Sequence, residues 1–224
     1  MLSLLAVLVA AGLLLCCSGR PERVGDKRNM NGAQMAQQDN CKLVVQCEIK
    51  EAKTLVLRYT FQNGTPSNIY VFNRLYGHIE DGPVFSTDVN LLNVEVSERG
   101  ILLSKKIVPV PPDTEVEKPS IPCASLIRPG KEFTETLTLS LPVRPWTPYH
   151  ESGGEGALQE PVLLKVWFEV GYFVSNPKSD TLAQPVQTKQ GQAFYFDPFP
   201  VHGQKTLEVG PLPLSVPISR PSVD

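Results

Sequence analysis

The sequence predicts an all-β sandwich, in which two sheets pack face to face. Apolar and polar residues alternate with a period of two in one segment after another, as they do in strands that bury one face. The chain also holds 21 Pro and 16 Gly, which indicates many turns and strand edges. No segment shows a helical period over ten or more residues. Many short strands joined by turn residues are typical of a sandwich.

The first strands are expected in residues 41–50, 54–62 and 69–73. In the first, one face carries Cys41, Leu43, Val45, Cys47 and Ile49. In the second, one face carries Leu55, Leu57, Tyr59 and Phe61. Residues 63–68 contain Gly, Pro and two Asn, which favour a turn before the third strand. The triplet Asn63-Gly64-Thr65 also satisfies the glycosylation sequon, but turn chemistry explains these residues completely.

Later strands are expected in residues 92–97 and 101–108, joined as a hairpin through Glu98-Arg99-Gly100. A turn at 128–131 leads into a strand in which Phe133, Leu137, Leu139 and Leu141 alternate with Thr and Ser. The clearest alternation spans residues 162–172, and shorter strands are expected at 193–196 and 205–209.

This order of elements resembles an immunoglobulin-like or fibronectin-like antiparallel sandwich across residues 41–209. The resemblance rests on a strand pair, an Asn-rich turn, a variable middle, a Pro-Gly turn and a long aromatic strand. It implies a core about 10 Å thick between the two sheets. The Cys, Trp and Cys spacing of antibody domains is missing, and sandwiches of this kind host unrelated activities.

The N-terminus predicts export. Residues 1–19 are expected to be a signal peptide, because Leu2 to Leu15 is an uncharged apolar run too short for a comfortable membrane span. The run ends in Cys16 and Cys17, which resemble a bacterial lipobox and are candidates for lipidation; the alternatives are cleavage after Gly19 and a retained N-terminal anchor. Residues 20–40 are polar and predict a flexible linker. The sandwich domain is expected at 41–218, with a tail at 219–224.

Three further cysteines remain, namely Cys41, Cys47 and Cys123. An oxidising compartment favours one disulfide and one leftover thiol. Cys41 and Cys47 lie too far apart along one extended strand to bridge each other, so Cys123 paired with either is the expected disulfide. The alternative is that all three are small buried side chains.

Two segments are candidates for an interaction surface. Residues 108–123 contain five prolines and predict an extended surface loop that presents Glu115, Val116, Glu117 and Lys118; the alternative is a stiff crossover between sheets. Trp146 and Tyr149 precede a Gly-rich stretch and are candidate aromatic anchors, or else caps on one end of the sandwich.

No catalytic motif is recognisable. The three histidines, His78, His150 and His202, have no metal-ligand spacing, and a cation site at His78, Glu80, Asp81 and Asp88 is disfavoured against a solvated loop. We expect no enzyme activity, no cofactor and no metal. A net charge of −2 argues against nucleic acid as a partner.

The leading hypothesis is therefore an exported binding or scaffold protein of the bacterial cell envelope. It would be lipid-anchored or periplasmic, or else secreted, and its partner would be an unidentified protein or glycan. The alternatives are a secreted protease inhibitor that uses the proline-rich loop, and a hydrolase with an unrecognised site.

Overall fold

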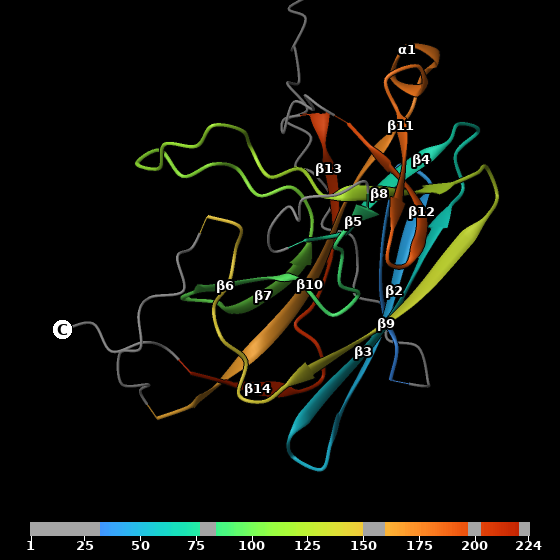
Figure 1. Cartoon of the computed structure of the whole chain (residues 1–224). Coiled ribbons are helices and arrows are strands. Elements are labelled where there is room, and N and C mark those ends of the chain that lie inside the picture. The colour runs from blue at the N-terminus through green and yellow to red at the C-terminus, as the bar shows by residue number, and fades with distance from the viewer. Residues whose placement is uncertain (1–31, 77–83, 150–159, 197–202, 220–224) are drawn as a thin grey trace, which may run out of the picture.

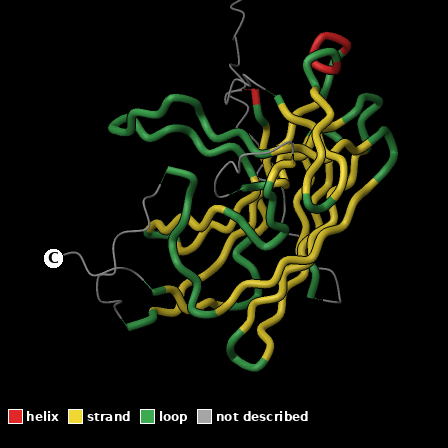
Figure 2. Tube along the Cα trace, in the orientation of Figure 1, coloured by secondary structure: helices red, strands yellow, loops and turns green. Residues whose placement is uncertain are grey.

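The computed structural model describes residues 32–76, 84–149, 160–196 and 203–219. These residues form two β-sheets that face each other across a shared core (Figure 1). The single helix among them, α1 (Pro177–Asp180), is four residues long. Strands and loops make up nearly all of the tube in Figure 2. The predicted all-β sandwich is confirmed.

The smaller sheet is antiparallel and has four strands in the order β1-β2-β3-β9. Its strands are β1 (Gln34–Gln38), β2 (Cys41–Lys50), β3 (Thr54–Asn63) and β9 (Glu132–Ser140). The last three closely match the predicted strands. In this register Tyr59 of β3 lies directly opposite Glu135 of β9, which later positions the buried site.

The larger sheet is organised around its longest strand, β10 (Val162–Val174). Its other strands are β4 (Ile69–Arg74), β5 (Val84–Phe85), β6 (Asn93–Ser97), β7 (Gly100–Lys105), β8 (Cys123–Ile127), β11 (Gln184–Thr188), β12 (Gly191–Tyr195), β13 (Lys205–Val209) and β14 (Ser215–Ile218). β10 pairs with β4, β7, β13 and β14. Its pairing with β7 is parallel, as is β5 with β11, so this sheet is mixed where an antiparallel one was expected.

The main core lies between the sheets. The predicted inward set on β3, from Leu55 to Phe61, is completely buried, and so are Val166, Phe168, Val170 and Tyr172 on β10. The prediction was wrong for the far end of β2, where Cys47 is only partly buried and Ile49 is 38% exposed.

The predicted flexible linker was too long. Residues 34–38 form β1, which pairs in full with the start of β2. Asp39 and Asn40 form the two-residue connection, and both have positive φ (51° and 62°), which is the geometry of a tight hairpin turn. Asn and Asp tolerate this conformation, so the Asp-Asn dipeptide was the feature of the sequence that could have predicted the turn. The predicted signal peptide and the rest of the linker lie outside the described residues.

Several short strands were missed because proline hides them. β11 contains Pro185, β14 contains Pro217, and β8 directly follows Pro122. Proline removes a backbone donor and is tolerated mainly on edge strands, so these segments resembled loops in the sequence. The predicted strand at 101–108 instead ends at Lys105, and the chain then leaves the sheet.

A second hydrophobic cluster covers the other face of β4 and β10. It is built around Tyr70, Phe72 and Phe173, which alternate along their strands with the main-core residues Val71 and Tyr172. Ile107, Ile121, Ala124 and Phe196 complete its buried members. The larger sheet is therefore buried on both faces in this region, and the two ends of the proline-rich segment are anchored here.

The turn into β7 provides a test of the fold. Gly100 has φ +136°, and a Cβ built on it would lie 2.4 Å from the Lys165 carbonyl oxygen, whereas Gly130 has φ +68° with open space around it. Gly130→Ala should therefore cost only the left-handed strain of about 1–2 kcal/mol. Gly100→Ala should cost clearly more, because the backbone of β10 must also move. Urea unfolding checks this; equal losses would contradict it.

Candidate functional site

Five polar side chains meet inside the sandwich, where apolar packing would be expected. They are Tyr59 of β3, Asn73 and Arg74 of β4, Lys105 of β7 and Glu135 of β9. We refer to them as the buried ionic cluster. Tyr59 and Glu135 come from the smaller sheet and the other three from the larger one, so the cluster joins the two sheets.

Glu135 lies at the centre of the cluster and receives four side-chain contacts. Its Oε2 accepts from the Tyr59 hydroxyl at 2.6 Å and lies 3.0 Å from Lys105 Nζ. Its Oε1 accepts from Arg74 Nη1 at 3.1 Å and from Asn73 Nδ2 at 3.3 Å. A buried carboxylate is tolerated only when its lone pairs are satisfied in this way.

Lys105 is completely buried. Besides Glu135, its ammonium group donates to the backbone carbonyl oxygens of Asn73 at 3.0 Å and Val89 at 2.7 Å. Burial lowers the pKa of Lys105, because desolvation penalises the charged amine, and the nearby Glu135 charge opposes that shift. The same burial, reinforced by the Glu135 charge, raises the pKa of the Tyr59 hydroxyl well above its ordinary value.

A β-bulge brings two consecutive side chains of β4 to the same carboxylate. Neighbouring residues of a regular strand point to opposite faces, yet Asn73 and Arg74 both reach Glu135. The pairing of β4 with β8 is irregular between Val71 and Arg74, so one extra residue is accommodated there. Asn73 Oδ1 and Arg74 Nε remain buried without a hydrogen-bond partner.

The sequence analysis missed this cluster, although a signal was present. Glu135 lies on the apolar face of its strand, between Phe133 and Leu137. Lys105 likewise lies on the apolar face of its own strand, after Ile101 and Leu103. A charged residue on the buried face of a strand needs a buried partner of opposite charge. The acidic Glu135 and the basic Lys105, each on the otherwise apolar face of its strand, could therefore have been recognised in the sequence as a buried ion pair. The bulge at Asn73 had no signal in the sequence.

The second candidate surface is the loop of residues 106–122, here called the proline-rich loop. Figure 1 draws it in light green, extending away from both sheets, and Figure 2 shows it without strand or helix. Its tip is exposed at Asp113, Glu115, Val116, Glu117 and Lys118. One backbone hydrogen bond, from Thr114 N to Pro111 O at 3.1 Å, closes a turn at the tip.

Side chains from elsewhere in the chain hold the base of this loop. The Gln204 amide donates to Ile107 O and accepts from Ile107 N, both at 2.9 Å. On the returning segment, the Tyr76 hydroxyl donates to Ile121 O at 3.0 Å. Ile107 and Ile121 are themselves buried in the second hydrophobic cluster. The loop is therefore fixed at both ends and exposed between them.

The two predicted aromatic anchors lie in different places, Tyr149 at the base of this loop and Trp146 at the edge of β6. Tyr149 accepts a hydrogen bond from Ser120 N at 2.8 Å through its hydroxyl, so it braces the loop base. Trp146 exchanges backbone hydrogen bonds with Val94 and covers the open edge of β6. Both side chains are partly buried. The role of Tyr149 is to hold the loop base in place. The segment at Trp146 covers backbone groups of the edge strand β6 that would otherwise be unpaired.

The three described cysteines are free thiols, in place of the disulfide that the residue count favoured. Cys41 belongs to the main core and Cys123 to a third small cluster, while Cys47 lies near the far end of β2. Burial raises the pKa of Cys47 to about 11 and that of Cys123 to about 12. These thiols are therefore poor nucleophiles. The lipidation candidates Cys16 and Cys17 lie outside the described residues.

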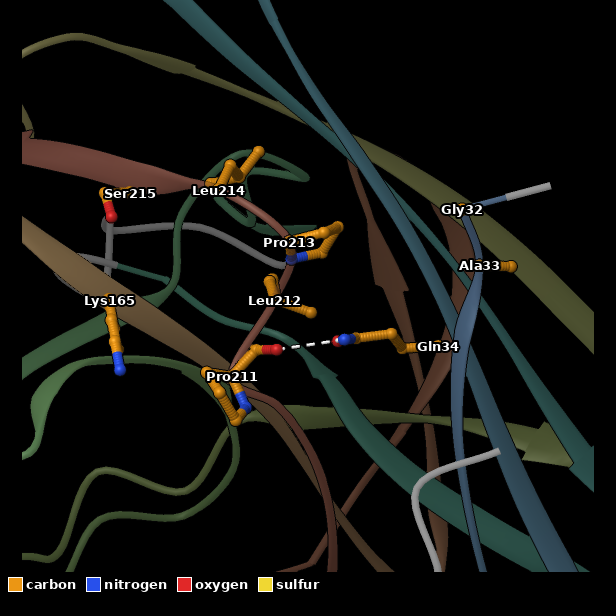
Figure 3. Close-up of a pocket in the computed structure, with 9 residues that line it drawn as sticks. All are labelled: Gly32, Ala33, Gln34, Lys165, Pro211, Leu212, Pro213, Leu214 and Ser215. Carbon is orange, nitrogen blue, oxygen red and sulfur yellow. Dashed lines mark hydrogen bonds between the residues drawn. The ribbon is translucent and has the colours of Figure 1, made fainter. Parts of the chain in front are cut away.

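A hollow of about 410 Å³ lies where β1 meets the segment before β14. Figure 3 shows its lining residues, which come from positions 32–34 and 211–215 together with Lys165. The Gln34 amide reaches across it and donates to Pro211 O at 2.9 Å. None of the lining residues is a carboxylate, thiol or imidazole, so the hollow offers no general acid or base of these types.

The remaining sequence candidates are not brought together by the described residues. His78, Glu80, Asp81, His150 and His202 lie outside them, and only Asp88 of the proposed cation loop is described. Across the described ranges, no group of three or more His, Cys, Asp or Glu is placed to hold a metal ion. Over the same residues, no helix has the length and apolar character needed to cross a bilayer.

Comparison of the chain with protein-family models, with curated proteins and with solved structures gives no significant match in any of the three. Its function must therefore be inferred from its own geometry.

The hydroxyl of Tyr59 provides a test of the buried ionic cluster. Tyr59→Phe removes the 2.6 Å hydrogen bond to Glu135 and should cost about 1.5–3 kcal/mol in free energy of unfolding, the range for bonds to charged groups. Tyr172→Phe is the matched control, because Tyr172 is equally buried and its hydroxyl has no hydrogen-bond partner among the described residues. It should cost under about 1 kcal/mol. Equal losses in urea unfolding would rule out a special role for Tyr59.

Proposed function

We propose that this chain is a non-catalytic recognition module of the bacterial cell envelope that presents the proline-rich loop to a protein partner. The observation that carries the proposal is the combination of a clamped base with an exposed tip. Gln204, Tyr76 and Tyr149 hold the backbone where the loop leaves and rejoins the body. The exposed residues lie between these clamps.

A clamped, proline-rich loop is well suited to binding because less conformational freedom is lost on association. Each proline fixes its own φ, and the loop contains Pro109, Pro111, Pro112 and Pro119 at exposed positions. Pre-organisation of this kind raises affinity by reducing the entropic cost of ordering. A crossover that only joined β7 to β8 would not need to extend from the body.

The chemistry of the tip indicates the kind of surface that it fits. Val116 is 39% exposed and is flanked in sequence by Glu115 and Glu117, with Asp113 nearby and Lys118 following. A complementary partner would offer an apolar pocket for Val116 with basic groups around it. Such charge complementarity favours specificity and rapid association more than raw affinity.

Capture of partners from envelope extract tests the loop. Val116→Ala combined with Glu115→Ala and Glu117→Ala should weaken capture at least about tenfold, since a few central residues carry most interface energy. The matched control is Glu48→Ala with Lys50→Ala, an exposed ion pair on the β2–β3 hairpin, which Figure 1 places at the other end of the molecule. Thermal melts confirm that both variants fold. Equal capture by wild type and tip variant would refute the proposal.

An inhibitor role is the second candidate, since a stiff exposed loop is also what a protease inhibitor inserts into an active site. Adding the purified protein to a panel of serine and cysteine proteases separates the two. Slowing of one enzyme by wild type and not by the tip variant would assign the loop to inhibition. No slowing of any enzyme would leave the recognition role alone.

The location in the proposal depends on the N-terminal apolar run and the cysteines that follow it. Mass spectrometry of the mature N-terminus tests it, and we expect a diacylated or triacylated Cys16 or Cys17. An unmodified N-terminus at Arg20 would instead indicate plain secretion. A leader retained on a cytosolic product would contradict export altogether.

A further inference from the structure

We propose that the side chains of Lys105 and Asn73 join in an intramolecular amide bond, with Glu135 moving the protons. The buried ionic cluster would then be a self-modification site that cross-links β4 to β7. This inference is independent of the recognition role proposed for the loop. It rests on the placement of three buried groups whose chemistry is complementary.

Glu135 contacts both reacting groups at once. One carboxylate oxygen lies 3.0 Å from Lys105 Nζ, and the other accepts from Asn73 Nδ2 at 3.3 Å. Lys105 and Asn73 are completely buried and Glu135 is 8% exposed. Holding an amine and an amide beside one carboxylate in a dry interior replaces the collision that such a reaction needs in water.

Lys105 has the properties of a nucleophile. Attack requires the neutral amine, and desolvation in the core favours the neutral form by lowering the Lys105 pKa. Glu135 is the adjacent base that can take the proton from the ammonium group. Lys105 Nζ also donates to the main-chain oxygen of Asn73 at 3.0 Å, so the amine is held at the residue whose side chain it would attack.

Asn73 has the properties of the electrophile. Its amide nitrogen, the leaving group, is hydrogen-bonded to Glu135, which can therefore return a proton to it. Its Oδ1, where negative charge develops during attack, is buried without a hydrogen-bond partner. Arg74 Nε, on the next residue of the bulge, is a buried donor that also lacks a partner. A donor able to turn toward that oxygen would stabilise the intermediate.

The reaction balances without any co-reactant. Glu135 takes a proton from the Lys105 ammonium group, and the free amine attacks Asn73 Cγ to form a tetrahedral intermediate. The new C–N bond stays and the Cγ–Nδ2 bond breaks, with protons passed through Glu135 to the departing nitrogen. Lysine ammonium and asparagine amide thus become a secondary amide and an ammonium ion, and Glu135 returns to its carboxylate. No group is oxidised or reduced.

The bond would reinforce a weak point of the larger sheet. β7 pairs with β10 at residues 166–170 and β4 pairs with it at 172–174, but β4 and β7 do not pair with each other. A covalent bridge between Asn73 and Lys105 would tie the two strands together where backbone hydrogen bonds do not. Closing the chain from 73 to 105 would also restrict the unfolded state, as a disulfide does.

A neighbouring lysine serves as an internal control. Lys106 Nζ lies 2.6 Å from Glu169 and 3.3 Å from Glu95, in a second largely buried ion pair. In the part of the chain that the structure describes, Lys106 is the side-chain partner of both carboxylates, and no side-chain amide is placed against them as Asn73 is placed against Glu135. Lys106 therefore has a base without an electrophile, and no cross-link is expected there.

Peptide mapping by mass spectrometry of the full-length expressed protein tests the inference. In the wild type, the peptide with Asn73 should be joined to the peptide with Lys105, and the pair should weigh about 17 Da less than the sum, the mass of lost ammonia. Glu135→Gln and Lys105→Met should restore the full mass and separate the peptides. Glu169→Gln, the matched control, should keep the link.

Two outcomes would overturn the proposal. One is a wild-type digest in which Asn73 and Lys105 lie on separate peptides of full mass, a result that needs no variant to fold. The other is a link that persists unchanged in folded Glu135→Gln, which would remove Glu135 from the reaction. Circular dichroism of each variant establishes folding before the masses are compared.

Discussion

The sandwich is constrained by the need to neutralise charges that lie between its sheets. Glu135 extends inward from the smaller sheet, and Lys105 and Arg74 meet it from the larger one. A buried charge without a partner costs several kcal/mol, so the sheets can pack only in the register that brings these groups together. Contacts between apolar side chains tolerate a small shift of one sheet relative to the other, but a carboxylate with four side-chain contacts does not. The cluster therefore specifies how the sheets are aligned, and hydrophobic burial supplies most of the driving force.

The β10 strand transmits this alignment to the rest of the molecule. Its inner face packs in the main core and its outer face packs in the second cluster, so both are positioned by one rigid strand. Ile107 and Ile121, which anchor the proline-rich loop, belong to that second cluster. The exposed tip is thus fixed to the same framework that holds the buried ionic cluster. The proposed recognition surface and the proposed cross-link therefore lie in separate parts of one scaffold.

The cluster also illustrates how a stabilising network can resemble an active site. Lys105, Glu135 and Asn73 are a nucleophile, a base and an electrophile, yet nothing from solvent needs to reach them. Burial, which excludes an outside substrate, favours a reaction within the chain by keeping water away from the amine and the amide. A protein exposed outside the cell would gain resistance to unfolding and proteolysis from such a bond.

Alternation alone predicted, to within a residue or two at each end, the strands that the structure places at 41–50, 54–63, 132–140 and 162–174. It could do so because the face on which a side chain of a strand lies depends only on its position along that strand. It also determined which side chains of β3 are buried. Tertiary structure alone decided that Pro185 and Pro217 lie in strands. A strand tolerates proline only where the missing backbone N–H is not needed by a neighbouring strand, and this depends on how the strands are arranged in the sheet. It likewise decided that β7 runs parallel to β10, that the cysteines stay apart, and that a bulge turns both Asn73 and Arg74 toward Glu135. These outcomes depend on contacts between residues far apart in the chain, which no local pattern records.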